Sequence, residues 1–359
     1  MSVQAETIDS DLIVHREGAA GIIRLNRPKT INALTLEMTR GIVAALDTFE
    51  TDPGVSLVLL EGAGERGLCA GGDIRGLYES AKSGGDLGPV FWREEYILNA
   101  RIPEFPKPYV AYMNGLVMGG GVGLSAHAAH RIVTETTKIA MPEVGLGFFP
   151  DVGGTWLLSR APGEIGTYFG LTGQVMSGAD AVYAGMADTL IATRDWATLR
   201  DALTNAPLQA THADIRAIIA RFAATDIQAP VAKHRELIDN VFAHDSMEEI
   251  EAALKQDGSV FSAETLKALS EKSPTALKVS LELLRRARAS KSLKECLARE
   301  YNSALAVFTS KEFVEGVRAA IIDKDRQPKW SPAKLDDVTP DIVEKYFAPN
   351  KTYKLVFPN

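Results

Sequence analysis

The sequence predicts an α/β fold built from repeated strand–strand–helix units and followed by a helical C-terminal region. Short apolar runs alternate with helical patterns through the first half of the chain. Two glycine-rich turns each follow a predicted strand and precede a helix, and strand patterns disappear from about residue 207 onward. We therefore expect residues 1–206 to form an α/β core and residues 207–359 to form a helical region.

The predicted core begins with two strands at residues 12–15 and 21–25, joined by a turn at Gly18. Thr35 is placed to cap a helix, because the apolar residues that follow it recur every three or four positions. Later elements repeat the same pattern. Strands are predicted for residues 56–60, 109–113, 131–134 and 138–141, with a short helix at 124–128.

The C-terminal region has helical periodicity. Ser273 and Pro274 form a typical helix start, with serine as the cap and proline in the first turn. A second helix is predicted from apolar residues on one stripe, namely Leu293, Leu297, Tyr301, Leu305 and Phe308. The basic run Arg285, Arg286 and Arg288 is interpreted as a solvated helix end, where cations suit the helix dipole.

The composition is that of an ordinary globular protein, with a formal net charge of −7 over 359 residues. This charge argues against nucleic acid or an anionic membrane as a partner, since both require a basic face. Cys69 and Cys296 are far apart in sequence, and His127 and His130 have no evident third ligand, so we expect neither a disulfide nor a metal site. The N-terminal residues lack the features of a signal or transit peptide, which favours a cytoplasmic protein.

The two glycine-rich turns, at residues 69–74 and 118–123, are the first candidates for a functional site. Glycine allows a ligand to approach the backbone closely, and a helix N-terminus presents free N–H groups. Two such turns could direct two N–H donors at one oxygen, which is the arrangement of an oxyanion hole. The alternative, that both turns are only tight connections, remains open on these residues alone.

These turns, in this order, resemble the hallmark segments of the crotonase (enoyl-CoA hydratase/isomerase) superfamily. The resemblance extends through residues 114–121 and 141–147 to residues 315–319 and 323–330, and so covers nearly the whole chain. It implies a crotonase-like spiral of ββα units with a C-terminal helical region. It also implies an acyl-CoA substrate.

The resemblance assigns roles to residues of both turns. The backbone N–H groups of Gly72 and Gly120 would polarise the thioester carbonyl of a CoA ester. Arg75 is at a position where the family often places a basic residue that meets CoA, although a plain surface arginine is an equal alternative, and Asn32 is expected near the adenine. The expected substrate-binding residues are Gly71, Asp73, Arg75, Gly119, Gly123 and Asn32.

The branch of the superfamily is indicated by the carboxylates. Hydratases hold a water with two glutamates, and here Gly123 occupies the first of those positions while Glu143 is retained. Asp151 is an added carboxylate, and this pattern resembles the 3-hydroxyisobutyryl-CoA hydrolases. Glu143, among apolar neighbours, would act as general base or as nucleophile. Asp151 could orient the water, bind the substrate hydroxyl, fix Glu143, or cap a helix that begins near Gly153.

The expected function is hydrolysis of a short β-hydroxyacyl-CoA thioester to the free acid and CoA, with valine catabolism as the setting that the resemblance implies. No cofactor is expected beyond the CoA moiety of the substrate. An enoyl-CoA hydratase or isomerase is the alternative within the superfamily, and a non-catalytic CoA-binding protein is the alternative of another class. The preferred acyl group and a homo-oligomeric state are left open.

Overall fold

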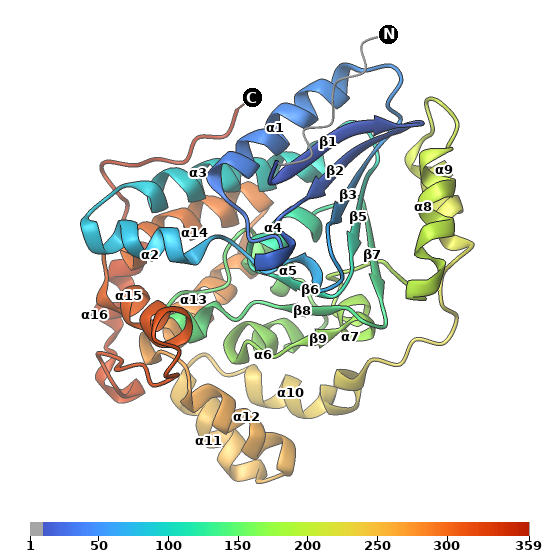
Figure 1. Ribbon diagram of the computed structural model, residues 1–359. Coiled ribbons are helices and arrows are strands. Elements are labelled where there is room, and N and C mark those ends of the chain that lie inside the picture. The colour runs from blue at the N-terminus through green and yellow to red at the C-terminus, as the bar shows by residue number, and fades with distance from the viewer. Residues whose placement is uncertain (1–9, 359) are drawn as a thin grey trace. The chain divides into compact units, whose positions relative to one another are not determined.

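The structure, a computed structural model, describes residues 10–358 (Figure 1). The chain forms two compact units. The first unit contains the residues up to Gly72 together with 98–139 and 176–230, and the second contains 73–97, 140–175 and the residues from Val231 onward. The units do not follow the predicted boundary between residues 206 and 207, because two segments of the N-terminal half pack with the C-terminal helices.

The first unit is built on a six-stranded sheet with the order β1-β2-β3-β5-β7-β10. β1 pairs with β2 in antiparallel fashion, and each of the remaining neighbours is parallel. The predicted strands of the core are confirmed, with ends that differ by a few residues. The strands are β1 (Leu12–Glu17), β2 (Ala20–Leu25), β3 (Leu57–Gly62), β5 (Tyr109–Met113), β7 (His130–Thr134) and β10 (Thr189–Ile191).

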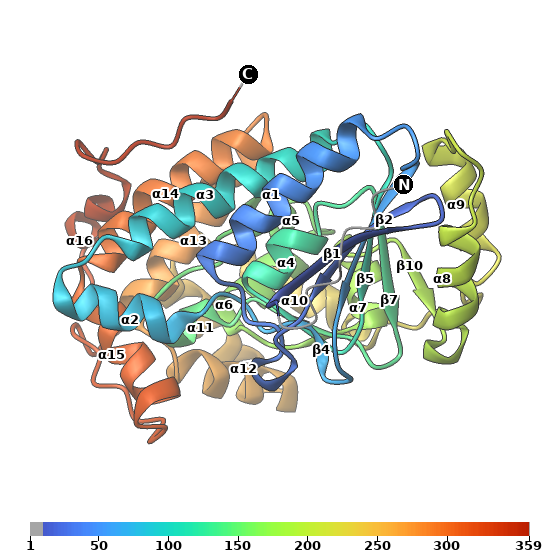
Figure 2. The ribbon, with the colours of Figure 1, turned by 45° about the horizontal axis from the view of Figure 1, so that its top comes forward.

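Alternate residues of this sheet are buried beneath two helices, α8 (Trp196–Thr204) and α9 (His212–Ala220), which lie beside one face of the sheet (Figure 2). The residues of one such row, among them Ile22 and Leu59, form an apolar cluster with side chains of these helices. Helix α1 (Leu36–Thr51) begins at the predicted cap, where the Thr35 side chain accepts a hydrogen bond from the backbone of Met38.

A second, four-stranded sheet of the first unit carries the two glycine-rich turns. Its order is β4-β6-β8-β9, formed by β4 (Gly67–Cys69), β6 (Leu116–Met118), β8 (Lys138–Ala140) and β9 (Met176–Ser177). Helix α4 (Gly120–Ser125) begins four residues before the predicted helix at 124. The reason is Gly119, whose φ of 47° turns the chain directly from β6 into the helix. A short helix of this unit, α7 (Gly178–Tyr183), follows β9.

The second unit is mostly helical. The predicted helices are confirmed as α13 (Pro274–Ala289), capped by Ser273, and α14 (Leu293–Phe308), capped by Ser292. The unit also contains α2 (Ile74–Ser83), most of α3 (Leu87–Arg101), the 3₁₀ turn η3 (Glu143–Leu146), α5 (Gly154–Leu158), α6 (Ile165–Thr172), α10 (Arg235–Phe242), α11 (Met247–Asp257), α12 (Val260–Ser270), α15 (Lys311–Val317) and α16 (Pro340–Glu344).

The interpretation of the basic run in α13 as a solvated helix end is wrong for Arg285. Its guanidinium forms an ion pair of 3.2 Å with Glu164 and donates to the carbonyls of Phe242 and His244. Arg288 also pairs with Glu164, whose carboxylate is buried. This part of α13 therefore anchors the start of α6, since an arginine fork can satisfy a carboxylate and several carbonyls together.

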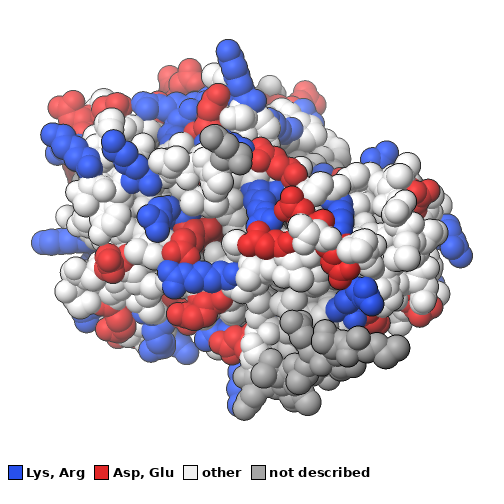
Figure 3. Space-filling view, turned by 90° about the horizontal axis from the view of Figure 1, so that it is seen from above, with Lys and Arg blue, Asp and Glu red and all other residues white. Residues whose placement is uncertain are grey.

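The surface charges are mixed. Basic and acidic side chains are interspersed over the face shown in Figure 3. In the part of the chain that the structure describes, no helix is long and apolar enough to cross a membrane.

Candidate active site

The two glycine-rich turns lie side by side in the first unit. They follow β4 and β6, which are parallel neighbours, so both turns leave the same edge of the sheet. Gly71 has a φ of 106°, and a Cβ there would be 3.4 Å from the carbonyl oxygen of Met118. A Cβ on Gly121 would be only 2.6 Å from the carbonyl oxygen of Cys69, so only glycine allows this close approach of the two backbones.

The expected oxyanion donors are the backbone N–H groups of Gly72 and Gly120. Among residues 10–358 no acceptor bonds to either group, nor to the N–H of Gly121, whereas the N–H groups of Val122 and Gly123, further along α4, bond to the carbonyl of Gly119. Gly120 opens α4, and the first N–H groups of a helix have no acceptor within the helix. Two donors on neighbouring turns are thus available to an external oxygen.

Asn32 is a structural residue, and its expected contact with the substrate is not supported. Its side chain is fully buried. The amide nitrogen donates to the carbonyls of Ala63, Gly67 and Leu68 at 3.0, 3.2 and 3.0 Å, and the amide oxygen accepts from the backbone of Arg27. These bonds use the amide entirely within the protein, and they hold the loop that leads into β4 and the first glycine turn.

The two expected carboxylates, Glu143 and Asp151, both belong to the second unit and are buried. Oε2 of Glu143 has no hydrogen-bond partner among the described residues, while Oδ2 of Asp151 accepts a hydrogen bond of 2.7 Å from the hydroxyl of Tyr96. Burial raises the pKa of Asp151 to about 7. Burial, and after it the charge of Asp151, raises the pKa of Glu143 well above its ordinary value. A carboxylate of this kind is a stronger base than one in water.

The interpretation of Asp151 as a helix cap is wrong. The N-cap of α5 is Gly153, and the Asp151 carboxylate faces Tyr96 instead. Only the backbone carbonyl of Asp151 serves the helix start, by accepting from the N–H of Gly154. The carboxylate is therefore committed to a side-chain network.

Three further residues of this network were missed in the sequence, namely Glu95, Tyr96 and Glu300. All three are buried, and Oε1 of Glu95 has no partner among the described residues. Burial, together with the charge of Asp151, raises the pKa of Glu95 well above its ordinary value. The available signal was helical: Glu95 lies on the same face of α3 as the buried side chains of Phe91 and Trp92, where a carboxylate is unexpected.

The other expected residues belong to α2 and α4 or directly precede these helices. Asp73 occupies the N-cap position of α2 without a side-chain capping bond, and Arg75 is exposed in the first turn of that helix. Gly119 precedes α4, and Gly123 is buried within it. In the described part of the chain, no group of three or more His, Cys, Asp or Glu side chains is placed to hold a metal ion.

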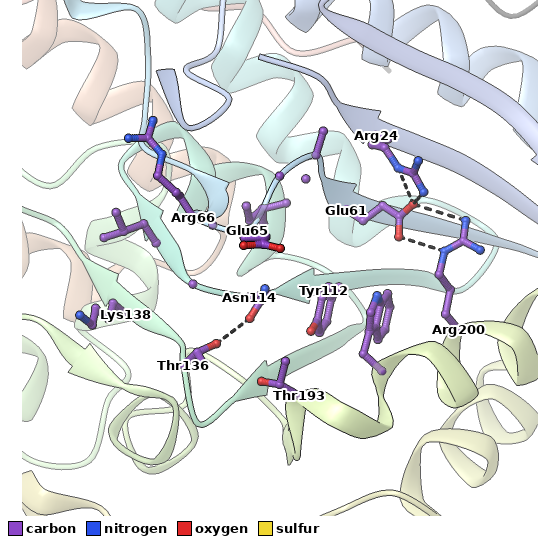
Figure 4. A pocket seen from close by; sticks show the side chains of 18 of the residues that line it. Arg24, Glu61, Glu65, Arg66, Tyr112, Asn114, Thr136, Lys138, Thr193 and Arg200 are labelled. Carbon is purple, nitrogen blue, oxygen red and sulfur yellow. Dashed lines mark hydrogen bonds and ion pairs between the residues drawn. The ribbon is translucent and has the colours of Figure 1, made fainter. Parts of the chain in front are cut away.

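The first unit has a cavity of about 980 Å³, and none of the expected site residues lines it (Figure 4). Glu61 lies between Arg24 and Arg200, and accepts from both guanidinium groups. The rings of Tyr112 and Trp196 stack with centroids 3.6 Å apart. Because Arg24 and Arg200 are already paired with a buried carboxylate, the visible role of this network is to join β2, β3 and α8.

The chain belongs to the enoyl-CoA hydratase/isomerase family, whose sequence model matches residues 20–347. It is 41% identical over 352 residues to the mitochondrial 3-hydroxyisobutyryl-CoA hydrolase of Rattus norvegicus, covering 97% of this chain and 90% of that protein. The enzyme of the same name from Homo sapiens is 40% identical, with coverages of 94% and 88%.

Two solved structures are similar over nearly the whole chain. A carnitinyl-CoA dehydratase from Mycobacterium thermoresistibile has a TM-score of 0.92 and 44% identity, with coverages of 97% and 99%. An enoyl-CoA hydratase from Rhodobacter sphaeroides 2.4.1 has a TM-score of 0.88 and 43% identity, with coverages of 97% and 100%. The predicted family and fold are confirmed. The relatives are named as hydrolases, as a dehydratase and as a hydratase.

The expectation of a cytoplasmic location is contradicted by these comparisons, because the hydrolases that this chain resembles are named as mitochondrial enzymes. The expectation rested on bulk composition and on the N-terminal residues. Composition does not report the compartment of an enzyme, and residues 1–9 lie outside the described part of the chain.

Proposed function

We propose that this chain hydrolyses a short β-hydroxyacyl-CoA thioester, with 3-hydroxyisobutyryl-CoA as the representative substrate, to the free acid and CoA. The observation that carries the proposal is the pair of buried carboxylates Glu143 and Asp151 in a chain that has Gly123 in place of a second glutamate. The names of the similar hydrolases support the same reaction.

In this proposal the N–H groups of Gly72 and Gly120 stabilise the oxygen of the tetrahedral intermediate. Their support is the adjacency of the two turns and the lack of internal acceptors among the described residues. Such donors act where negative charge develops, and the loss of one donor costs about 10²- to 10³-fold in kcat in a well-studied protease. Gly71 and Gly119 give the two turns their positive φ angles, and exposed Arg75 would meet the phosphates of CoA.

Glu143 is proposed to act on the attacking water. Because its carboxylate is buried and Oε2 has no partner among the described residues, Glu143 can take the proton of a water molecule, or it can attack the thioester carbonyl and form an anhydride as the C–S bond breaks and CoA leaves. The nearby charge of Asp151 strengthens Glu143 as a base. Hydrolysis is neutral in redox terms, so the proposal requires no cofactor beyond the CoA moiety of the substrate.

The alternative within the family is hydration of an enoyl-CoA, which the names of the two similar structures suggest. Hydration requires a base for the water and an acid for the α-carbon. A glutamate at position 123 would supply a second group, but the residue there is glycine. Glu143 would then have to perform both steps, which favours hydrolysis.

The test compares thiol release from 3-hydroxyisobutyryl-CoA with hydration of crotonyl-CoA. We expect the unmodified enzyme to release thiol and not to hydrate. Glu143→Ala and Asp151→Asn should each lose thiol release by about 10²- to 10⁴-fold. Glu164→Gln is the matched control, since Glu164 is a buried carboxylate of the same unit that pairs with Arg285. Hydration without thiol release would refute the proposal, and binding of CoA esters without either reaction would indicate a non-catalytic protein.

The two roles of Glu143 are separable by isotope labelling. A single turnover in H₂¹⁸O should place ¹⁸O in the Glu143 side chain if the residue attacks and water then opens the anhydride at the protein carbonyl. If Glu143 acts as a base, the label appears only in the released acid. Label in the peptide that contains residue 143, detected by mass spectrometry, would demonstrate attack by Glu143.

A further inference from the structure

Glu300, on α14, contacts the turn that follows Asp151. Its carboxylate is fully buried. Oε2 accepts from the backbone N–H of Gly153 at 2.7 Å, and Oε1 accepts from the backbone N–H of Thr155 at 3.1 Å and from the Thr155 hydroxyl. All of these groups belong to the second unit. A single side chain therefore binds both the N-cap residue of α5, Gly153, and a residue of its first turn, Thr155.

The turn that Glu300 binds is strained. Val152 and Gly153 directly follow Asp151, and their φ angles are 51° and 78°. Glycine tolerates this left-handed region, but for a β-branched residue such as valine it is a genuine outlier. Strained backbone of this kind persists only where the surrounding structure holds it. The carboxylate of Glu300 accepts three hydrogen bonds from Gly153 and Thr155, immediately after the strained residue.

The same helix also supports Tyr96. Tyr301, the neighbour of Glu300 on α14, packs edge to face against the ring of Tyr96, with centroids 6.2 Å apart. Its hydroxyl is fixed by a 2.9 Å hydrogen bond to the carbonyl of Pro89. Consecutive residues of α14 therefore hold the two partners of the Tyr96–Asp151 hydrogen bond.

We infer that Glu300 is a positioning residue, which holds the strained turn at Val152 and Gly153 so that the Asp151 carboxylate stays directed at Tyr96. The inference rests on the proposed function, because it assigns Glu300 an effect on catalysis through Asp151. Glu300 itself makes no contact with the reacting atoms in this scheme. The electrostatic coupling is consistent with it, since burial and then the charge of Asp151 raise the pKa of Glu300, to about 7.

A purely structural role would have different consequences. Glu300 also satisfies N–H groups at the start of a helix, and such a contact stabilises any fold whether or not a catalytic group is nearby. Loss of stability alone reduces the amount of folded enzyme. Such a loss of stability leaves the kcat of the remaining folded enzyme unchanged, both with Asp and with Asn at position 151.

The experiment is a double-variant cycle with Glu300→Gln and Asp151→Asn, measured as thiol release from 3-hydroxyisobutyryl-CoA. Glutamine keeps the size of the side chain, but its NH₂ group cannot accept, so one of the two N–H donors loses its partner. In the otherwise unmodified enzyme we expect kcat to fall by about tenfold, since small misplacements at a site are costly, with little change in KM. In the Asp151→Asn background the further loss should be no more than about twofold, because the residue that Glu300 positions is already absent.

Two further variants keep the inference falsifiable. Glu164→Gln removes another buried carboxylate at the start of a helix, α6, and should lower the melting temperature while kcat is retained. Thr155→Val removes the hydroxyl bond to Glu300 and keeps the backbone N–H bond, so it is the test to use if Glu300→Gln does not fold. We expect a kcat loss of about threefold for Thr155→Val that disappears in the Asp151→Asn background.

Two outcomes would overturn the inference. The first is an unchanged kcat in Glu300→Gln, or in Thr155→Val if Glu300→Gln does not fold. The second is an equal loss of kcat with Asp151 and with Asn at position 151. An unmodified enzyme that released no thiol would instead be a failure of the proposed function. The two failures are therefore distinguishable.

Discussion

The hydroxyl of Tyr96 donates a hydrogen bond of 2.7 Å to Oδ2 of Asp151, and both side chains are buried. Burial raises the pKa of the Asp151 carboxyl, whereas this hydrogen bond stabilises its charged form and lowers the pKa. The balance leaves the pKa at about 7. Tyr96 therefore increases the proportion of Asp151 that is ionised near neutral pH.

The first prediction concerns Tyr96→Phe. The hydroxyl lowers the pKa of Asp151 and so opposes the effect of burial. Without the hydroxyl, the pKa of Asp151 should rise. If the ionised form of Asp151 supports catalysis, the acid limb of the pH profile of kcat/KM should move to higher pH. Tyr301→Phe is the control, because its hydroxyl bonds to the carbonyl of Pro89 and not to a carboxylate. An acid limb at the same pH in Tyr96→Phe would contradict the prediction.

The second prediction concerns the pH dependence of stability. The pKa of Asp151 is raised from 3.8 to about 7 on folding, so between these values the folded state holds a proton that the unfolded state has lost. This group therefore lowers the free energy of unfolding as pH rises from about 4 to about 7, by up to about 1.4 kcal/mol per pH unit. Below pH 4 and above pH 7 its contribution is constant.

Asp151→Asn tests this effect, because asparagine does not titrate. Urea unfolding at several pH values between 4 and 8 should show that the variant becomes more stable relative to the unmodified protein as pH rises, and that the difference levels off above about pH 7. Parallel stability curves for the two proteins would show that the pKa of Asp151 is not raised. The comparison cancels the contributions of the surface carboxylates.

The third prediction concerns the contact between the two glycine turns. Gly121→Ala places a Cβ 2.6 Å from the carbonyl of Cys69, so the turns must separate. Overpacking of this kind costs about 1–3 kcal/mol, and the displacement should also reduce kcat for thiol release. Gly76→Ala, on α2, is the control, since its Cβ meets only the side chain of Leu87 at 3.6 Å. Equal kcat in Gly121→Ala and the unmodified enzyme would mean that the spacing of the turns is unimportant.

The fourth prediction separates the roles of Asn32 and Arg75. Asn32→Ala leaves buried carbonyls without donors, so it should lower the free energy of unfolding by about 1–3 kcal/mol. Arg75→Ala removes an exposed side chain and should instead raise KM for the CoA ester, with an unchanged melting temperature. Thermal unfolding and steady-state kinetics on both variants check this. A raised KM without destabilisation in Asn32→Ala would restore its expected role in substrate binding.

Much of the fold was predictable because the signals are local. Thr35 and Ser273 cap helices where the sequence placed the caps, and the buried strands of the parallel sheet read as short apolar runs. The predicted start of α4 was wrong, because the turn depends on the positive φ of Gly119. Glycine adopts positive and negative φ about equally well, so the sequence does not indicate which one is present. The grouping of residues 73–97 and 140–175 with the C-terminal helices depends on long-range packing, which no local pattern reports.

The site was only partly predictable for the same reason. The expected residues Glu143 and Asp151 came from the resemblance, and the structure shows that both are buried in one unit. Glu300 was missed because its partners, Gly153 and Thr155, are about 150 residues away in sequence. Asn32 was assigned to the substrate from the resemblance, whereas its amide donates to three carbonyls that lie 31 to 36 residues away and that no local pattern links to it.

The distance of 147 residues between Gly153 and Glu300 has a consequence for the growing chain on the ribosome. Synthesis proceeds from the N-terminus at about 5–20 residues per second. The time between synthesis of the strained turn after Asp151 and synthesis of α14 is therefore at least several seconds. During that interval the turn lacks the carboxylate that satisfies its N–H groups. The nascent chain can assemble the six-stranded sheet early, yet it acquires an ordered carboxylate cluster only when most of its length has left the ribosome.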